Sequence, residues 1–159
     1  MADLKFEDAT LDAVSLLSVR KEMKAEPEAI GAAMAEAFGA VWQAREAAGA
    51  PAITPPMAAY VSMAEGVATA DIGMGVAPGD AGKFPSDGDL RVVELPAGAA
   101  IRVIHKGPYA KLGETYKAAF AHVAMSGKTP GFPIRESYLN DPQETPESDW
   151  LTQIDVPVS

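Results

Sequence analysis

The sequence predicts an α+β fold, in which an antiparallel sheet carries two long helices on one of its faces. Segments of alternating or β-branched apolar residues are interspersed with two longer segments of helical periodicity. The order strand, helix, strand, strand also occurs twice along the chain. The 159 residues, of which 48% are hydrophobic, are enough for one domain with a buried core. We therefore expect a single domain over residues 1–159, built from a duplicated strand-helix-strand-strand module.

The first half of the duplication is expected over residues 13–77. Its first strand is AVSLLSVRKEM, residues 13–23. A helix should begin at Pro27, because proline is favoured in the first helical turn and the neighbouring glutamates complement the helix dipole. Gly49 should end this helix. Apolar residues recur along it at helical spacing: Ile30, Met34, Ala37, Phe38, Val41 and Trp42. Two strands complete the half, at residues 57–63 and 67–77.

The second half is expected over residues 90–158, after a linker at residues 78–89 that is dense in turn-forming residues. It begins with a strand pair around Pro96-Ala97-Gly98. A helix from about Tyr109 to Ser126 follows, and Gly127 ends it. The apolar face of this helix comprises Leu112, Tyr116, Ala119, Phe120 and Val123. The segments GFPIRESYLNDP and WLTQIDVPV supply the last two strands.

The two halves are related by a constant difference in residue number, which we call the repeat offset. The offset that separates Tyr60 from Tyr138 also separates Gly49 from Gly127. Because the order of elements is shared as well, duplication is the better interpretation. Either half alone would bury little, so we expect the halves to join into one sheet, with a cleft on the pseudo-twofold axis between them.

Glu136 departs from this repeat. It shares strand parity with Ile134 and Tyr138, so its carboxylate should point to the same side as two large apolar side chains. The repeat offset maps Glu136 onto Ala58. One half thus has a carboxylate where the other has a methyl group, which indicates that Glu136 is not required by the repeated scaffold.

The charge balance of the chain restricts its partners. Acidic residues outnumber basic ones, 22 to 13, for a net charge of −9, which argues against a general binder of phosphate backbones. Few residues precede the first predicted strand, so no DNA-binding segment and no direct DNA binding are expected. The chain has no cysteine, which excludes disulfides and thiolate chemistry. No signal peptide or membrane span is recognisable, and we expect a bacterial-type cytoplasmic protein.

Three segments carry a resemblance to a known family. They contain His105, Gly107, Pro108 and Tyr109 at the start of the second helix, then Glu136, Tyr138, Asn140, Asp141 and Pro142, and finally Thr152, Ile154, Pro157 and Val158. Their order and spacing are specific, and the likeness covers residues 14–158. The chain resembles the GyrI-like small-molecule-binding domain, which is the effector-binding domain of AraC-type and MerR-type multidrug regulators and also occurs as stand-alone proteins.

The resemblance implies a ligand cleft between the halves, in which Glu136 is the carboxylate that meets cationic, lipophilic ligands. Aromatic side chains should line this cleft, since their rings offer contact area and cation–π attraction. The expected ligand-binding residues are Glu136, Tyr138, Trp42, Tyr60, Phe38, Tyr109 and Tyr116. No cofactor and no metal are expected, because no ligand-spacing pattern, phosphate-binding loop or nucleophile motif is present.

On residue types alone, Glu136 has a simpler explanation. It could pair with Arg135, Arg102 or Lys106, or reach solvent from an edge strand, because structural ion pairs also involve carboxylates. The family resemblance favours the ligand-binding role. Without a ligand, burial should raise the pKa of the carboxyl group, and an arriving cation should lower it again.

Three functions are compatible with the sequence. The leading hypothesis is a stand-alone binding protein for amphipathic, cationic small molecules, which acts by sequestration or effector sensing. The second is a hydrolase that opens strained rings of cyclopropane-type toxins, with Glu136 as general base and Tyr60, Tyr109 or Tyr138 as the hydrogen-bond donor to the leaving oxygen. The third is inhibition of DNA gyrase by protein contact, which would make gyrase or a regulator a partner.

Overall fold

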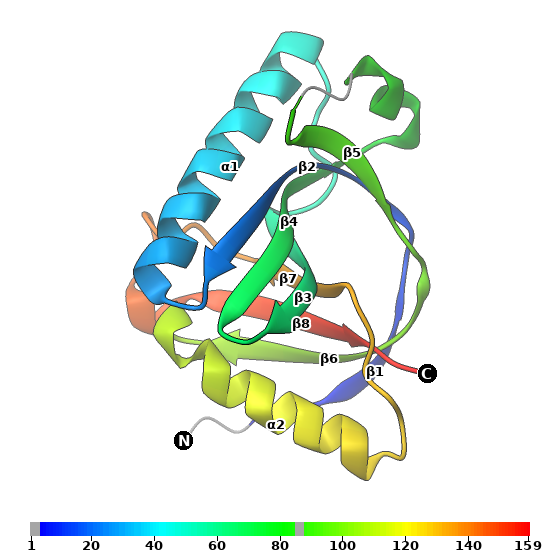
Figure 1. The fold of residues 1–159 in the computed structure, drawn as a ribbon, viewed down its shortest axis with the longest axis vertical. Coiled ribbons are helices and arrows are strands. Elements are labelled where there is room, and N and C mark those ends of the chain that lie inside the picture. Colours follow the sequence, from blue (N-terminus) through cyan, green and yellow to red (C-terminus); the bar gives the residue numbers. More distant parts are fainter. Residues whose placement is uncertain (1–3, 85–87) are drawn as a thin grey trace.

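The computed structural model describes residues 4–84 and 88–159, which form an eight-stranded antiparallel sheet with two long α-helices (Figure 1). The strand order is β1-β6-β8-β7-β3-β4-β2-β5. The strands are β1 Glu7–Leu11, β2 Val14–Lys24, β3 Met57–Ala64, β4 Val67–Val76, β5 Leu90–Leu95, β6 Gly98–Lys106, β7 Ile134–Tyr138 and β8 Leu151–Pro157. The helices are α1 Pro27–Ala48 and α2 Leu112–Met125. The predicted α+β class is confirmed.

Both helices pack on the same face of the sheet and share one hydrophobic core. Ala37 and Val41 of α1 are completely buried, as are Ala119 and Val123 of α2. Each pair is spaced by one helical turn, so its side chains form a ridge toward the sheet. All four join one cluster with strand residues such as Ile154.

The helix ends follow the turn chemistry of the sequence. Helix α1 has Pro27 in its first turn and ends at Gly49, whose φ of 64° lies in the left-handed region that glycine favours. The predicted second helix is divided, because Tyr109–Lys111 form a 3₁₀ turn before α2 begins. Within the described residues, neither helix is long and apolar enough to cross a membrane.

Strand β1 is absent from the sequence-based prediction. Its residues, EDATL, are mostly polar and exposed, and only Leu11 is buried. A strand of this kind lacks the apolar alternation by which strands are recognised. Its position is set by backbone pairing with β6 instead.

The predicted linker at residues 78–89 is partly ordered. It begins with a 3₁₀ helix at Pro78–Lys83, which its turn-rich composition does not predict. Residues 85–87 lie outside the described residues. The division of the chain into halves on either side of this linker stays a prediction.

Strands β1 and β5 each pair with a strand from the other side of the 78–89 segment. Strand β1 precedes β2 in the chain but pairs with β6, and β5 precedes β6 but pairs with β2 (Figure 1). On the sheet face opposite the helices, the buried Arg135 side chain donates hydrogen bonds to the carbonyl oxygens of Asp12, at 3.0 Å, and Pro96, at 2.8 Å. Asp12 lies in the β1–β2 connection and Pro96 in the β5–β6 connection. One guanidinium group therefore bridges these two connections by hydrogen bonds.

The halves meet at the β3–β7 pair in the middle of the sheet. Ala58 and Glu136 are direct cross-strand neighbours there, and the repeat offset exchanges one position for the other. The pseudo-twofold axis therefore passes between these two residues. Tyr60 and Tyr138, which the same offset relates, lie two residues further along their strands on the same face.

Candidate functional site

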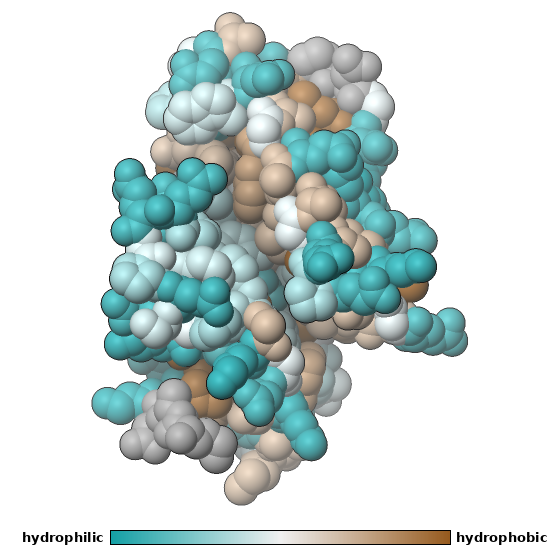
Figure 2. Space-filling model, turned by 90° about the vertical axis from the view of Figure 1, so that its left-hand side faces the viewer, coloured by the Kyte–Doolittle hydropathy of each residue, from teal (hydrophilic) through white to brown (hydrophobic). Residues whose placement is uncertain are grey.

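A cavity of about 1180 Å³ lies between the sheet and the N-terminal halves of both helices. Figure 2 looks onto the side of the molecule where these helix ends meet and shows a furrow with pale and brown side chains along it. Helix α1 contributes Pro27, Ile30, Met34 and Phe38, and α2 contributes Leu112 and Tyr116. Residues 139–143, which follow β7, border the cavity.

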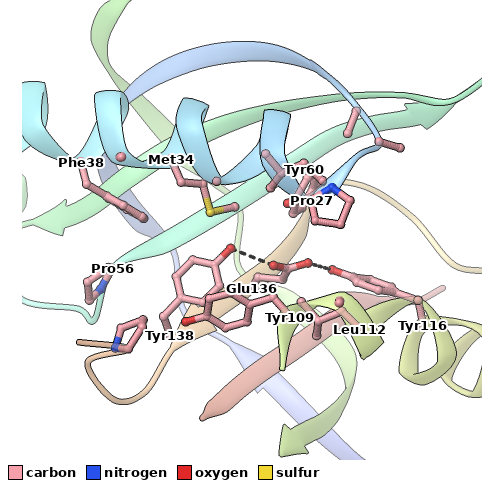
Figure 3. A pocket seen from close by; sticks show the side chains of 18 of the residues that line it. Pro27, Met34, Phe38, Pro56, Tyr60, Tyr109, Leu112, Tyr116, Glu136 and Tyr138 are labelled. Atoms are coloured by element: carbon pink, nitrogen blue, oxygen red, sulfur yellow. Dashed lines mark hydrogen bonds between the residues drawn. The ribbon is translucent and has the colours of Figure 1, made fainter. Parts of the chain in front are cut away.

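Glu136 lies at the base of this cavity, on the pseudo-twofold axis (Figure 3). Its side chain is buried, with the residue only 3% exposed. The hydroxyl group of Tyr138 donates a hydrogen bond to its Oε1 at 2.8 Å, and the hydroxyl group of Tyr116 donates to its Oε2. Both carboxylate oxygens thus accept a phenol hydrogen bond.

The basic residues that could have paired with Glu136 lie elsewhere. Arg135, its neighbour on β7, points to the opposite face of the sheet and binds backbone carbonyls. Arg102 forms an ion pair with Asp155 at 2.7 Å, and Lys106 lies 3.7 Å from Asp149. The explanation of Glu136 as one half of an ion pair is therefore wrong for the described part of the chain.

The surroundings of Glu136 act on its pKa in opposite directions. Burial raises the pKa of the carboxyl group, and the hydrogen bonds from Tyr116 and Tyr138 lower it in part. Burial and the nearby charge of Glu136 also raise the pKa of the Tyr60, Tyr109, Tyr116 and Tyr138 hydroxyl groups. These four phenols are accordingly kept neutral, and two of them, Tyr116 and Tyr138, donate hydrogen bonds to the carboxyl group.

Aromatic rings form a continuous wall beside the carboxylate. The ring of Tyr109 lies 5.7 Å from that of Tyr138 and 4.7 Å from that of Trp150. The edge of Phe38 meets Tyr138 at a centroid distance of 6.2 Å, with the rings nearly perpendicular. Such geometries are favourable for aromatic pairs. They fix the orientation of Tyr138 and hence of its hydrogen bond to Glu136.

The remainder of the wall is apolar and adaptable. Met34, Met63 and Met74 line the cavity together with small residues of α1 and β4. Unbranched thioether side chains can repack around ligands of different shape. Among the described residues that line the cavity, the charged side chains are Glu136 and Asp141, and none is basic.

The structure brings together most of the predicted site residues and excludes one. Glu136, Tyr138, Tyr60, Phe38, Tyr109 and Tyr116 all line the cavity. Trp42 does not: it is 53% exposed, and the guanidinium carbon of Arg45 lies 4.9 Å above its ring. The cavity extends along α1 only as far as Phe38, one turn before Trp42. The expectation that Trp42 lines the cleft is wrong for this reason.

The cavity also contains residues that the sequence did not identify, among them Asp141 and Pro56. Asp141 borders the cavity after β7, and Pro56 does so before β3. In the sequence, Asp141 contributes only to the family resemblance, without a role in the site, and Pro56 lies in a loop. Their relation to Glu136 depends on how β3 and β7 pair, which no local pattern reveals.

The sequence matches the family model of the GyrI-like small molecule binding domain over residues 6–159. The chain belongs to this family. The GyrI-like resemblance inferred from the sequence motifs is thereby confirmed. The search of curated proteins gives no match to the chain.

Several solved structures have the same fold as this GyrI-like domain. The C-terminal domain of EcmrR is 21% identical with a TM-score of 0.82, and the match covers 98% of both chains. EcmrR in complex with DNA matches with 21% identity and a TM-score of 0.79, over 98% of this chain and 57% of EcmrR. This GyrI-like domain therefore spans just over half the length of that regulator.

Two further structures are more distant. A hydrolase from Listeria innocua is 15% identical with a TM-score of 0.65, over 98% of this chain and 92% of the hydrolase. SAV2435 bound to tetraphenylphosphonium is 13% identical with a TM-score of 0.62, over 98% of this chain and 94% of SAV2435. At these identities the likeness establishes a common fold alone.

Proposed function

We propose that this GyrI-like domain binds amphipathic organic cations in the cavity above Glu136. The observation that carries the proposal is a buried carboxylate, 3% exposed, with no ion-pair partner among the described residues. Removing an isolated charge from water is unfavourable unless the charge is paired or the group becomes neutral. A cationic ligand would supply the missing partner.

The arrangement of hydrogen bonds indicates what kind of cation fits. Both oxygens of Glu136 already accept hydrogen bonds from Tyr116 and Tyr138. A ligand with a primary ammonium group would bring several N–H donors into a largely apolar cavity, where only the remaining lone pairs of the two carboxylate oxygens could accept them. A quaternary ammonium, phosphonium or delocalised aromatic cation has few or no N–H donors to satisfy, and the aromatic wall would stabilise it by cation–π attraction. The binding of tetraphenylphosphonium by SAV2435, which shares the fold, supports this choice.

The domain's biological role would be to bind such molecules as effectors or to sequester them. The shared fold with the C-terminal domain of the DNA-binding protein EcmrR supports effector sensing. In that role, ligand occupancy would be reported to a regulatory partner. Sequestration would need only the domain itself.

Binding of tetraphenylphosphonium, measured by isothermal titration calorimetry, tests the proposal. Glu136→Gln keeps the size of the side chain and removes its charge, so we expect affinity to fall about tenfold to a hundredfold, the range for a lost charged interaction. Trp42→Ala, outside the cavity, is the matched control and should bind like the wild type. Equal affinity of wild type and Glu136→Gln would contradict the electrostatic part of the proposal.

The hydrolase hypothesis has one observation in its favour. Burial raises the pKa of Glu136, and a general base works best when its pKa approaches the working pH. Against it, both carboxylate oxygens already accept a phenol hydrogen bond, which makes the carboxylate a weaker base toward a water molecule. Incubation with a cyclopropane-bearing substrate distinguishes the two functions: Glu136-dependent turnover beyond one equivalent would establish a hydrolase, whereas stoichiometric binding alone would not.

A further inference from the structure

The second charged residue of the cavity has no assigned role. Asp141 follows β7 and lines the same cavity as Glu136. It is exposed, in contrast to the buried Glu136, so it stands where the cavity meets solvent. Among the described residues, no lysine, arginine or histidine forms an ion pair with it.

Local hydrogen bonds fix the position of Asp141 but use only one of its oxygens. The backbone N–H of Gln143 donates to Oδ1 at 2.8 Å. Just before it, Asn140 donates to the carbonyl oxygen of Asp149 at 2.9 Å and accepts from the backbone N–H of Leu151 at 3.1 Å. These bonds hold the loop against the start of β8, while Oδ2 of Asp141 has no partner among the described residues.

The hydroxyl group of Tyr109 interacts electrostatically with both carboxylates. After burial, the charges of Glu136 and then Asp141 raise the pKa of its hydroxyl group. Its ring belongs to the aromatic wall, between Tyr138 and Trp150. One aromatic surface therefore runs from the buried carboxylate toward the exposed one.

We propose that Asp141 is a second cation-binding residue of this cavity, so that the cavity prefers dications that carry one delocalised charge for Glu136 and a second charge for Asp141. The inference rests on the proposed function, because it adds a contact to the same binding site. It is distinct from that function, since a domain that bound only monocations would need no acid at this position. An exposed carboxylate pairs weakly, and we expect selectivity of about twofold to fivefold.

The test compares ethidium and propidium, which share a phenanthridinium ring, whereas propidium carries a second cation on its alkyl chain. Fluorescence titrations at low ionic strength are made with the wild type and with Asp141→Asn, which retains the oxygen that accepts from Gln143. Propidium should lose about twofold to fivefold in affinity and ethidium less. Glu144→Gln, an exposed acid outside the cavity lining, is the charge-matched control and should change both dyes little.

Salt and the Glu136 variant separate the possible failures. The preference for propidium should vanish at about 1 M salt, where the Debye length is about 3 Å. If Asp141→Asn weakens both dyes equally, or weakens propidium no more than Glu144→Gln does, the dication inference is overturned while the proposed function stands. If neither dye binds the wild type, or Glu136→Gln binds both as well as the wild type does, the proposed function fails and the inference fails with it.

Discussion

Strands β3 and β7 occupy equivalent places on the two sides of the pseudo-twofold axis, yet they carry different chemistry. Strand β3 has Met57 and Ala58, and β7 has Arg135 and Glu136 at the positions related by the repeat offset. The two charged residues point to opposite faces of the sheet. Arg135 binds the β1–β2 and β5–β6 connections, and Glu136 faces the cavity.

This difference shows which residues a duplicated fold can place at both of the equivalent positions beside its pseudo-twofold axis. Positions that face each other across the axis are close, with cross-strand Cβ atoms about 5 Å apart. A carboxylate in both halves would place two like charges side by side in a buried site, which is strongly unfavourable. Tyrosine can occupy both equivalent positions, as Tyr60 and Tyr138 do, because neutral phenols do not repel each other. The charge can exist in one half only.

Introducing the acid into both halves should have the largest effect. Ala58 is completely buried beside Glu136, so Ala58→Glu should lower the free energy of unfolding by about 3–5 kcal/mol, the cost of an uncompensated buried charge. Urea denaturation measures this. Ser62→Glu, at an exposed position of the same strand, is the control.

The double variant Ala58→Glu with Glu136→Ala then moves the acid from one half to the other. It should recover part of the lost stability, since only one carboxylate remains on the axis. A double variant less stable than Ala58→Glu alone would refute repulsion across the axis as the cause.

A smaller effect should distinguish the two tyrosines that the repeat relates. The hydroxyl group of Tyr138 donates to Glu136 at 2.8 Å, so Tyr138→Phe removes a hydrogen bond that lowers the pKa of the carboxyl group. We expect its affinity for tetraphenylphosphonium to fall about fivefold, the equivalent of roughly 1 kcal/mol. Tyr60→Phe removes a hydroxyl group without a hydrogen bond to Glu136 and should change affinity less than about twofold. Equal losses in the two variants, measured by calorimetry, would show that the halves contribute alike.

The pH dependence of stability should be the most gradual effect. Burial raises the pKa of Glu136 in the folded protein, so the folded state binds this proton more tightly than the unfolded chain does. Its contribution to stability is complete below the unfolded pKa, about 4.3 for glutamate. It is lost as the pH rises through the folded pKa. Unfolding curves measured at a series of pH values should therefore show that the free energy of unfolding falls more steeply with rising pH for the wild type than for Glu136→Gln. Indistinguishable slopes would mean that the folded pKa is not raised.

Most of the fold was predictable because its elements carry local signals. The helix at Pro27–Ala48 has a proline start, a glycine end and an apolar face, and the long strands alternate or are rich in apolar residues. The repeat offset also identified Glu136 as an exception. Strand β1 was missed, because its pairing with β6 depends on backbone groups more than on apolar side chains.

The sequence predicted the chemical character of the site, an aromatic cleft with one carboxylate, but not which residues lie at its borders. Phe38 and Trp42 are one helical turn apart, so the periodicity treats them alike. Only the structure reveals that the helix has left the cavity by Trp42, whose ring instead lies beneath Arg45. Asp141 was missed for the converse reason: a turn residue becomes part of a site only through the tertiary contacts of its loop.

The pairing of β1 with β6 has a consequence for folding during synthesis on the ribosome. Residues 7–11 leave the ribosome before their partner strand, which begins only at Gly98. Strand β1 therefore cannot pair until β6 has been synthesised, and contacts of such long sequence separation form slowly. The sheet can therefore be completed only after β6 has been synthesised, because β1 and β5 both pair with strands that are not their neighbours in the chain.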